Sequence, residues 1–73
     1  MGILSNISGK QVVSAFAKAG WRKAGQGGSH LVMTKPGVKA NLSIPLHREL
    51  GPGLMRSLIH DAGMSVKEFL ELL

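Results

Sequence analysis

The sequence predicts a single α+β domain in which helices pack on one face of a three-stranded antiparallel sheet. Apolar residues recur at helical spacing toward both ends of the chain and at strand spacing in the middle. Short turns rich in glycine and proline separate the central segments, so consecutive strands are expected to pair as antiparallel neighbours. With 73 residues, 44% of them apolar, the chain is expected to form one domain over residues 1–73 with a modest core.

The first helix is expected over about residues 9–19. Ser8 and Gln11 have the spacing of a capping box, in which each side chain accepts a hydrogen bond from the other residue's backbone N–H. Gly20 follows at a position where helices often end on a residue with positive φ. The side chains expected to face the core lie on one stripe and are Val12, Val13, Phe16 and Ala19.

Three strands are expected to follow this helix. A short strand over residues 21–24 is followed by a glycine-rich turn at 25–28, since glycine tolerates positive φ. A second strand is expected over 29–34, and the Pro-Gly pair within 35–38 is typical of a β-turn. The third strand is expected over 39–44, and Pro45 ends it because proline has no backbone N–H to donate.

The third strand has one apolar and one polar face. Its apolar residues are Ala40, Leu42 and Ile44, and its polar residues are Lys39, Asn41 and Ser43. In the second strand, residues 31–33 are apolar on both faces, so alternation does not decide which face lies toward the helices. If Leu31 and Met33 face the helices, His30 lies on the open face of the sheet.

Two more helices are expected after the sheet. Pro52 suits the first turn of a helix, and Gly63 is expected to follow its end. Ser65 and Glu68 form a second capping box, which predicts a short C-terminal helix over residues 66–72. Together these helices are expected to cover one face of the sheet and to leave the other open.

The charge is unevenly distributed along the chain. Residues 1–48 contain seven Lys or Arg and no acidic residue, whereas residues 49–73 contain all four Asp and Glu. A segment with this balance attracts polyanions such as nucleic acid. An acidic protein partner, or a surface that only keeps the chain soluble, is the alternative explanation.

The available side chains restrict the chemistry. A magnesium-dependent nuclease needs clustered carboxylates, and a zinc site needs about three or four ligands. The histidines His30, His47 and His60 fall on three different elements, and a Ser-His-Asp triad lacks a suitable Asp, so we expect no metal and no cofactor. Acid–base chemistry by histidine remains, and RNA suits it because the 2′-hydroxyl is a built-in nucleophile.

His30 is the best-placed candidate base, because it follows a glycine turn that a phosphodiester can approach closely. The alternative is an ordinary solvated histidine on a strand. His47 is a candidate second acid or base, or a residue whose hydrogen bond orders the loop after the third strand. The candidate phosphate contacts, each of which has a solvated surface charge as its alternative, are Arg22, Lys23, Lys35 and Lys39.

Several short motifs in the chain resemble the HicA toxins of bacterial toxin–antitoxin systems. They are Gly20-Trp21, Gly28-Ser29-His30, Pro45-Leu46-His47 and Gly51-Pro52-Gly53, and the resemblance extends from about residue 9 to residue 69. It implies a double-stranded-RNA-binding-like α-β-β-β-α fold and an mRNA-cleaving toxin that works without a metal. It also implies that His30 is the catalytic histidine and that a HicB-like antitoxin covers it.

Together, residues and resemblance predict an endoribonuclease toxin of the cytoplasm that cleaves mRNA through His30. Gly28 and Ser29 are expected to contact the RNA with the four basic residues named above, and His47 is a further candidate. The alternatives are a non-catalytic module that recognises double-stranded RNA, and a domain whose basic face binds an acidic protein. No apolar run approaches the roughly 18 residues of a membrane span, and we expect no membrane association.

Overall fold

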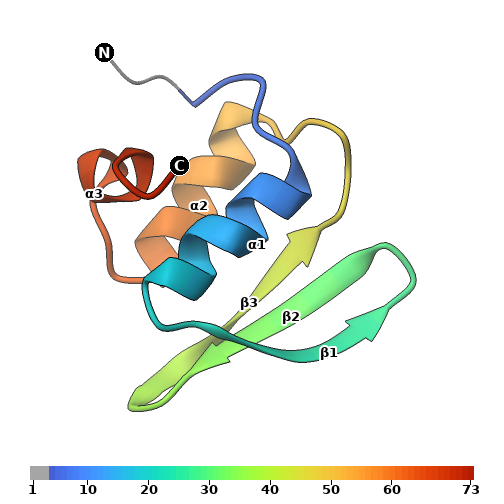
Figure 1. Cartoon of the computed structure of the whole chain (residues 1–73), viewed down its shortest axis with the longest axis vertical. Coiled ribbons are helices and arrows are strands. Elements are labelled where there is room, and N and C mark those ends of the chain that lie inside the picture. The colour runs from blue at the N-terminus through green and yellow to red at the C-terminus, as the bar shows by residue number, and fades with distance from the viewer. Residues whose placement is uncertain (1–3) are drawn as a thin grey trace.

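The computed structural model describes residues 4–73 and contains three helices and three strands (Figure 1). Residues 1–3 of the predicted domain lie outside the described part. The elements, in chain order, are α1 (Gly9–Lys18), β1 (Arg22–Gly27), β2 (His30–Lys35), β3 (Val38–Pro45), α2 (Pro52–Asp61) and α3 (Val66–Leu70). This arrangement confirms the predicted α+β class, with a three-stranded antiparallel sheet in the order β1-β2-β3 and a short C-terminal helix.

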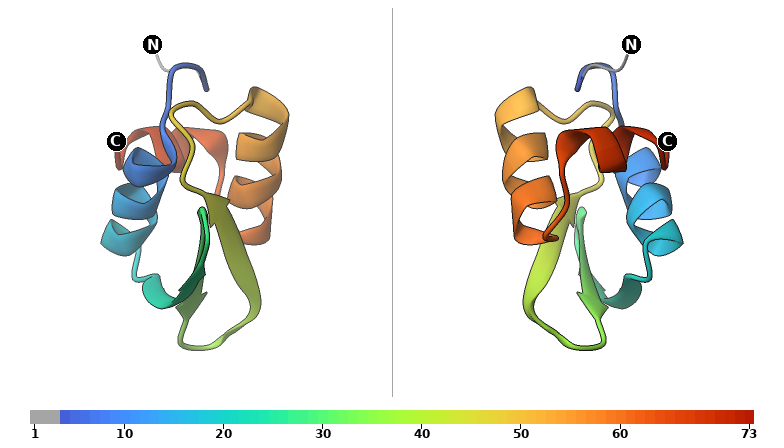
Figure 2. Two further views of the ribbon diagram at one scale, coloured as in Figure 1. Left: turned by 90° about the vertical axis from the view of Figure 1, so that its right-hand side faces the viewer. Right: turned by 90° about the vertical axis from the view of Figure 1, so that its left-hand side faces the viewer.

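The helices lie on one side of the sheet, and α1 and α2 both contact β3 (Figures 1 and 2). The helix α3 packs on α2, away from the strands (Figure 1). No helix among residues 4–73 combines the length and the apolar character that a membrane crossing requires.

Both predicted capping boxes are present. The Ser8 backbone N–H donates to Gln11 Oε1 at 2.8 Å, and the Gln11 N–H donates to Ser8 Oγ at 3.2 Å. The same pair of bonds joins Ser65 and Glu68, at 2.9 and 3.1 Å. The helices end slightly before the predicted residues: α1 stops at Lys18, and α3 stops at Leu70.

The turn between the first two strands differs from the prediction. A four-residue turn was expected at 25–28, but β1 continues through Gly27 and only Gly28 and Ser29 form the turn. Backbone pairing with β2 continues to the Gly27–His30 pair, and Gly28 alone adopts positive φ, at 59°. The glycines therefore extend a strand, because backbone pairing with β2 continues up to the two-residue turn that suits a β-hairpin.

The faces of β2 and β3 follow the alternation of their side chains. Leu31, Met33, Leu42 and Ile44 are buried toward the helices, whereas His30 is exposed on the other face. Ala40 was predicted to lie on the buried face but is exposed. The reason is that the β2–β3 turn projects beyond the helices, so no element covers this end of the strand (Figure 1).

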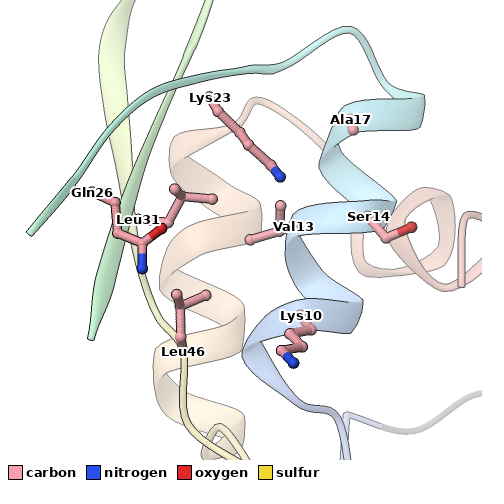
Figure 3. A pocket seen from close by; sticks show the side chains of 8 residues that line it. All are labelled: Lys10, Val13, Ser14, Ala17, Lys23, Gln26, Leu31 and Leu46. Carbon is pink, nitrogen blue, oxygen red and sulfur yellow. The ribbon is translucent and has the colours of Figure 1, made fainter. Parts of the chain in front are cut away.

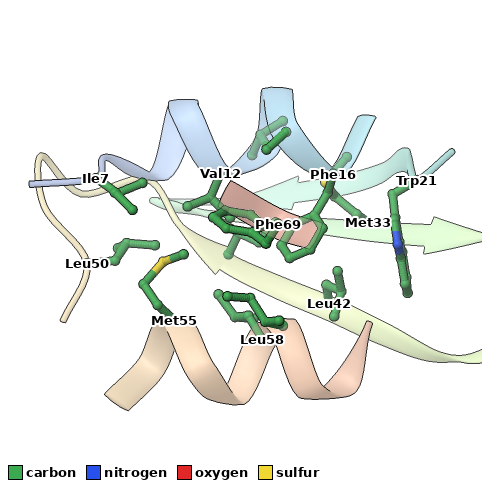
Figure 4. Close-up of a cluster of buried hydrophobic side chains, with 14 of the residues drawn as sticks. Ile7, Val12, Phe16, Trp21, Met33, Leu42, Leu50, Met55, Leu58 and Phe69 are labelled. Carbon is green, nitrogen blue, oxygen red and sulfur yellow. The ribbon is translucent and has the colours of Figure 1, made fainter. Parts of the chain in front are cut away.

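The core lies between the helices and the sheet (Figure 4). Phe16 of α1 and Phe69 of α3 are both fully buried, with ring centroids 5.2 Å apart. Trp21 packs edge-on against Phe16 at 6.2 Å and is 2% exposed, which confirms the interpretation of Trp21 as a core residue rather than a base-stacking surface. Met55 is also fully buried, as expected from its place on the apolar stripe of α2.

Candidate functional site

His30 is the first residue of β2 and directly follows the Gly28-Ser29 turn. Its side chain is exposed, because alternation places the next residue, Leu31, in the core. A Cβ added at Gly27 or Gly28 would meet no atom within 4 Å. The backbone before His30 is therefore open to a large ligand.

The loop after β3 is fixed by backbone contacts at two points. The Leu46 N–H donates to the Ser29 carbonyl oxygen at 2.6 Å, which joins the end of β3 to the turn before His30. The Gly9 N–H donates to the His47 carbonyl oxygen at 2.9 Å, which joins the loop to the start of α1. A side chain at Gly9 would collide with the Pro45 carbonyl oxygen and place its Cβ 2.8 Å from the Leu46 Cα. Glycine is thus required for this close approach.

These contacts bring His30 and His47 together. Their ring centroids are 6.2 Å apart, and the ring planes meet at 71°. The pairing of His30 with Pro45 across β2 and β3 explains the proximity, because His47 follows Pro45 by two residues. Both histidines are exposed. The sequence placed these histidines on separate elements and could not show that the elements meet.

The third histidine does not join this pair. His60 is exposed near the end of α2, a different element from those that carry His30 and His47. Within residues 4–73, no three His, Asp or Glu side chains gather in a way that could hold a metal ion. Two neighbouring imidazoles can still offer one bound substrate a proton donor and a proton acceptor.

The basic residues predicted to contact RNA lie in different places. Arg22 pairs with Thr34, which belongs to the same face of β2 as His30, whereas Lys23 pairs with the buried Met33 and so faces the helices. Lys35 is at the far end of β2 from His30, and five residues of strand span roughly 16 Å. Lys39 is exposed near the start of β3, also at that far end.

A cleft between α1 and β1 lies on the helix side of the sheet (Figure 3). It has a volume of about 550 Å³ and is lined by Lys10, Val13, Ser14, Ala17, Lys23, Gln26, Leu31 and Leu46. Lys23 points from β1 toward α1, and Lys10 lies across from it on the first turn of the helix (Figure 3). Lys10 and Gln26 were not predicted as site residues, because only the folded arrangement, in which β1 faces α1 across this cleft, brings them together.

The electrostatic character of the site follows from the distribution of charged residues along the chain. The strands and α1 contain no acidic residue, so no carboxylate from these elements offsets the charge of Lys10, Arg22 or Lys23. The carboxylate of Glu68 has its pKa lowered, first by the backbone hydrogen bond from Ser65 and then by the Ser65 hydroxyl, but it lies on α3. The strands and α1 therefore carry basic but no acidic side chains, which suits a phosphate backbone.

Comparison with known families gives one match over most of the chain. A family model described as the HicA toxin of bacterial toxin–antitoxin systems matches residues 9–64. A comparison with curated proteins finds no match. The matched range begins at Gly9, whose close approach to the loop was described above, includes His30 and His47, and ends just before the capping box of α3.

Proposed function

Because this chain belongs to the HicA toxin family of bacterial toxin–antitoxin systems, we propose that it is a metal-independent endoribonuclease that cleaves mRNA, with His30 as its catalytic base. The observation that carries this proposal is the position of His30, which is exposed beside an open glycine turn in a segment without acidic residues. A solvated imidazole at such a place can reach a phosphodiester. The match of the family model over this segment supports the toxin role, and the RNA substrate is what the resemblance to that family implies.

In this proposal, the His30 imidazole takes the proton of the 2′-hydroxyl next to the bond that breaks. The 2′ oxygen then forms a bond to phosphorus, and the bond from phosphorus to the 5′ oxygen breaks. The products are a 2′,3′-cyclic phosphate and a 5′ hydroxyl, whose oxygen takes up one proton. Cationic side chains stabilise the extra negative charge of the five-coordinate phosphorus.

The RNA contacts follow from the placement of the basic residues. We assign the phosphate nearest the cleaved bond to the backbone of Gly28 and Ser29. Arg22 shares the His30 face of the sheet but pairs with Thr34, roughly 13 Å along β2 from His30, so it contacts a phosphate farther along the RNA. Lys23 contacts the RNA from the cleft beside α1. Lys35 and Lys39, at the other end of the sheet, contact phosphates farther along the strand and add affinity without taking part in the chemistry.

A HicB-like antitoxin is the proposed protein partner, and it acts by covering His30. The open face of the sheet supports this, because no helix of the described chain covers it (Figure 2). Val32 is half-buried on that face, two residues from His30, and offers an apolar contact. An antitoxin bound there excludes RNA from the histidine.

The test is digestion of mRNA by the wild type, by His30→Ala and by His60→Ala, all in excess EDTA. We expect the wild type and His60→Ala to cleave equally, because His60 lies on α2, and His30→Ala to be slower by about 10²-fold or more. Equal cleavage by wild type and His30→Ala contradicts the role of His30. Cleavage that requires added metal contradicts the metal-independent mechanism, and RNA binding without any product supports the non-catalytic module instead.

A further inference from the structure

The cleavage reaction requires two proton transfers, and His30 accounts for one. The second histidine of the pair, His47, has its ring centroid 6.2 Å from that of His30. The two side chains come from different elements, one from the start of β2 and one from the loop after β3, and both are exposed. Solvent, and therefore a substrate, can reach both rings.

A structural role for the His47 ring is not needed to hold its loop. The backbone bonds from Leu46 to Ser29 and from Gly9 to the His47 carbonyl oxygen already fix the loop on both sides. Among residues 4–73, the side-chain hydrogen bonds join the two capping boxes and tie Lys18 to the Leu72 carbonyl oxygen. None of them uses the His47 ring, so its nitrogens are free to exchange protons with a ligand.

The separation of the two rings suits a single phosphodiester. A hydrogen bond from a ring nitrogen to oxygen spans about 2.8 Å, so imidazoles whose centroids lie 6.2 Å apart can each contact a different oxygen of one phosphate group. The ring planes are steeply inclined, at 71°, so the two rings do not stack face to face. The fixed backbone around the pair holds this arrangement before substrate binds.

We propose that His47 is the general acid of the reaction and donates a proton to the departing 5′ oxygen while His30 removes the proton of the 2′-hydroxyl. This inference rests on the proposed ribonuclease function. One proton enters His30 and one leaves His47, the bond from the 2′ oxygen to phosphorus forms, and the bond from phosphorus to the 5′ oxygen breaks. Hydrolysis of the cyclic phosphate with the roles reversed restores both protonation states.

The decisive experiment varies the leaving group. An RNA oligonucleotide is made with sulfur in place of the 5′ bridging oxygen at the bond that the wild type cleaves fastest, since a thiolate leaves without a proton. We expect His47→Ala to cleave ordinary RNA about 10²-fold more slowly than the wild type and to recover to within about tenfold on the sulfur-linked RNA. His30→Ala is expected to stay slow on both substrates, and His60→Ala is the matched control.

The pH dependence of cleavage is a second measurement, and a purely structural role of His47 would leave its shape unchanged. A base must be deprotonated and an acid protonated, so the wild-type kcat/KM is expected to fall at both low and high pH. His47→Gln is expected to lose the decline on the alkaline side while keeping the acidic one. Circular dichroism of each variant verifies that the fold is retained.

Two results would overturn the inference. One is that His47→Ala cleaves ordinary RNA within about threefold of the wild type, against the 10² to 10⁴-fold typical of acid–base catalysis. The other is that His47→Ala is equally slow on ordinary RNA and on the sulfur-linked RNA. Either result leaves the proposed function intact, because that function is tested separately, by His30→Ala, by cleavage in EDTA and by the appearance of RNA products.

Discussion

At the scale of single residues, Gly9 connects the start of α1 with the loop that carries His47. Its N–H donates to the His47 carbonyl oxygen, and its missing side chain leaves room for Pro45 and Leu46. The backbone on both sides is fixed, by the helix and by the last pairs of β3. A methyl group at this position therefore forces two backbone segments apart.

We expect Gly9→Ala to lower the free energy of unfolding by about 1–3 kcal/mol, the usual cost of overpacking. Gly53→Ala is the matched control, because Gly53 also lies in the first turn of a helix but a Cβ there meets nothing within 4 Å. Urea denaturation measures both, with Gly53→Ala as stable as the wild type or slightly more so. Equal stability of Gly9→Ala and wild type would contradict the close approach.

At the scale of the elements, the capping boxes fix where α1 and α3 begin. The two boxes differ in one respect: the first uses the neutral Gln11, whereas the second uses the carboxylate of Glu68. The hydrogen bond from the Ser65 backbone N–H favours the ionised form and lowers the pKa of Glu68 from its ordinary value. Because the folded pKa is depressed, this stabilisation is present above the unfolded pKa and is lost as pH falls through the folded pKa.

We expect Glu68→Gln to remove that part of the pH dependence while keeping the box, as Gln11 does at α1. The melting temperatures of wild type and variant are compared at pH 7 and at pH 3. The wild type is expected to lose more stability than Glu68→Gln on this change, because only the wild type loses an ionised cap. A larger loss in Glu68→Gln would show that the cap does not depend on charge.

At the scale of the whole molecule, α3 completes the core although it lies outside the residues that match the family model. Phe69 is fully buried and contacts the ring of Phe16 across the centre of the domain (Figure 4). In a domain of 73 residues the core is small, and Phe69 is among its largest fully buried side chains. The site at the edge of the sheet therefore depends on a helix that does not touch it.

We expect Phe69→Ala to cost about 3–5 kcal/mol, which is comparable to the whole stability typical of a domain this small. Circular dichroism at 37 °C is expected to show a largely unfolded chain. Phe69→Leu is the milder comparison and is expected to remain folded with a lower midpoint. A fully folded Phe69→Ala would mean that α3 is dispensable for the core.

Local signals in the sequence determined most of the fold. The capping boxes at Ser8 and Ser65 fixed two helix starts, because both partners lie within three residues of each other. The alternation in residues 39–44 predicted the faces of β3 correctly where helices cover it. The absence of acids before residue 49 restricted the expected chemistry to histidine, and the family resemblance, carried in part by Gly28-Ser29-His30, selected His30 as the candidate without any tertiary information.

Only the tertiary structure decided which distant residues meet. The extent of β1 depends on pairing with β2, so glycines that predict a wide turn in isolation became part of a strand. His47 lies beside His30 because β2 and β3 pair up to Pro45 and because Gly9 lets the loop pass close to α1. These contacts join segments far apart in sequence, and their geometry depends on strand register and packing, which no local pattern specifies.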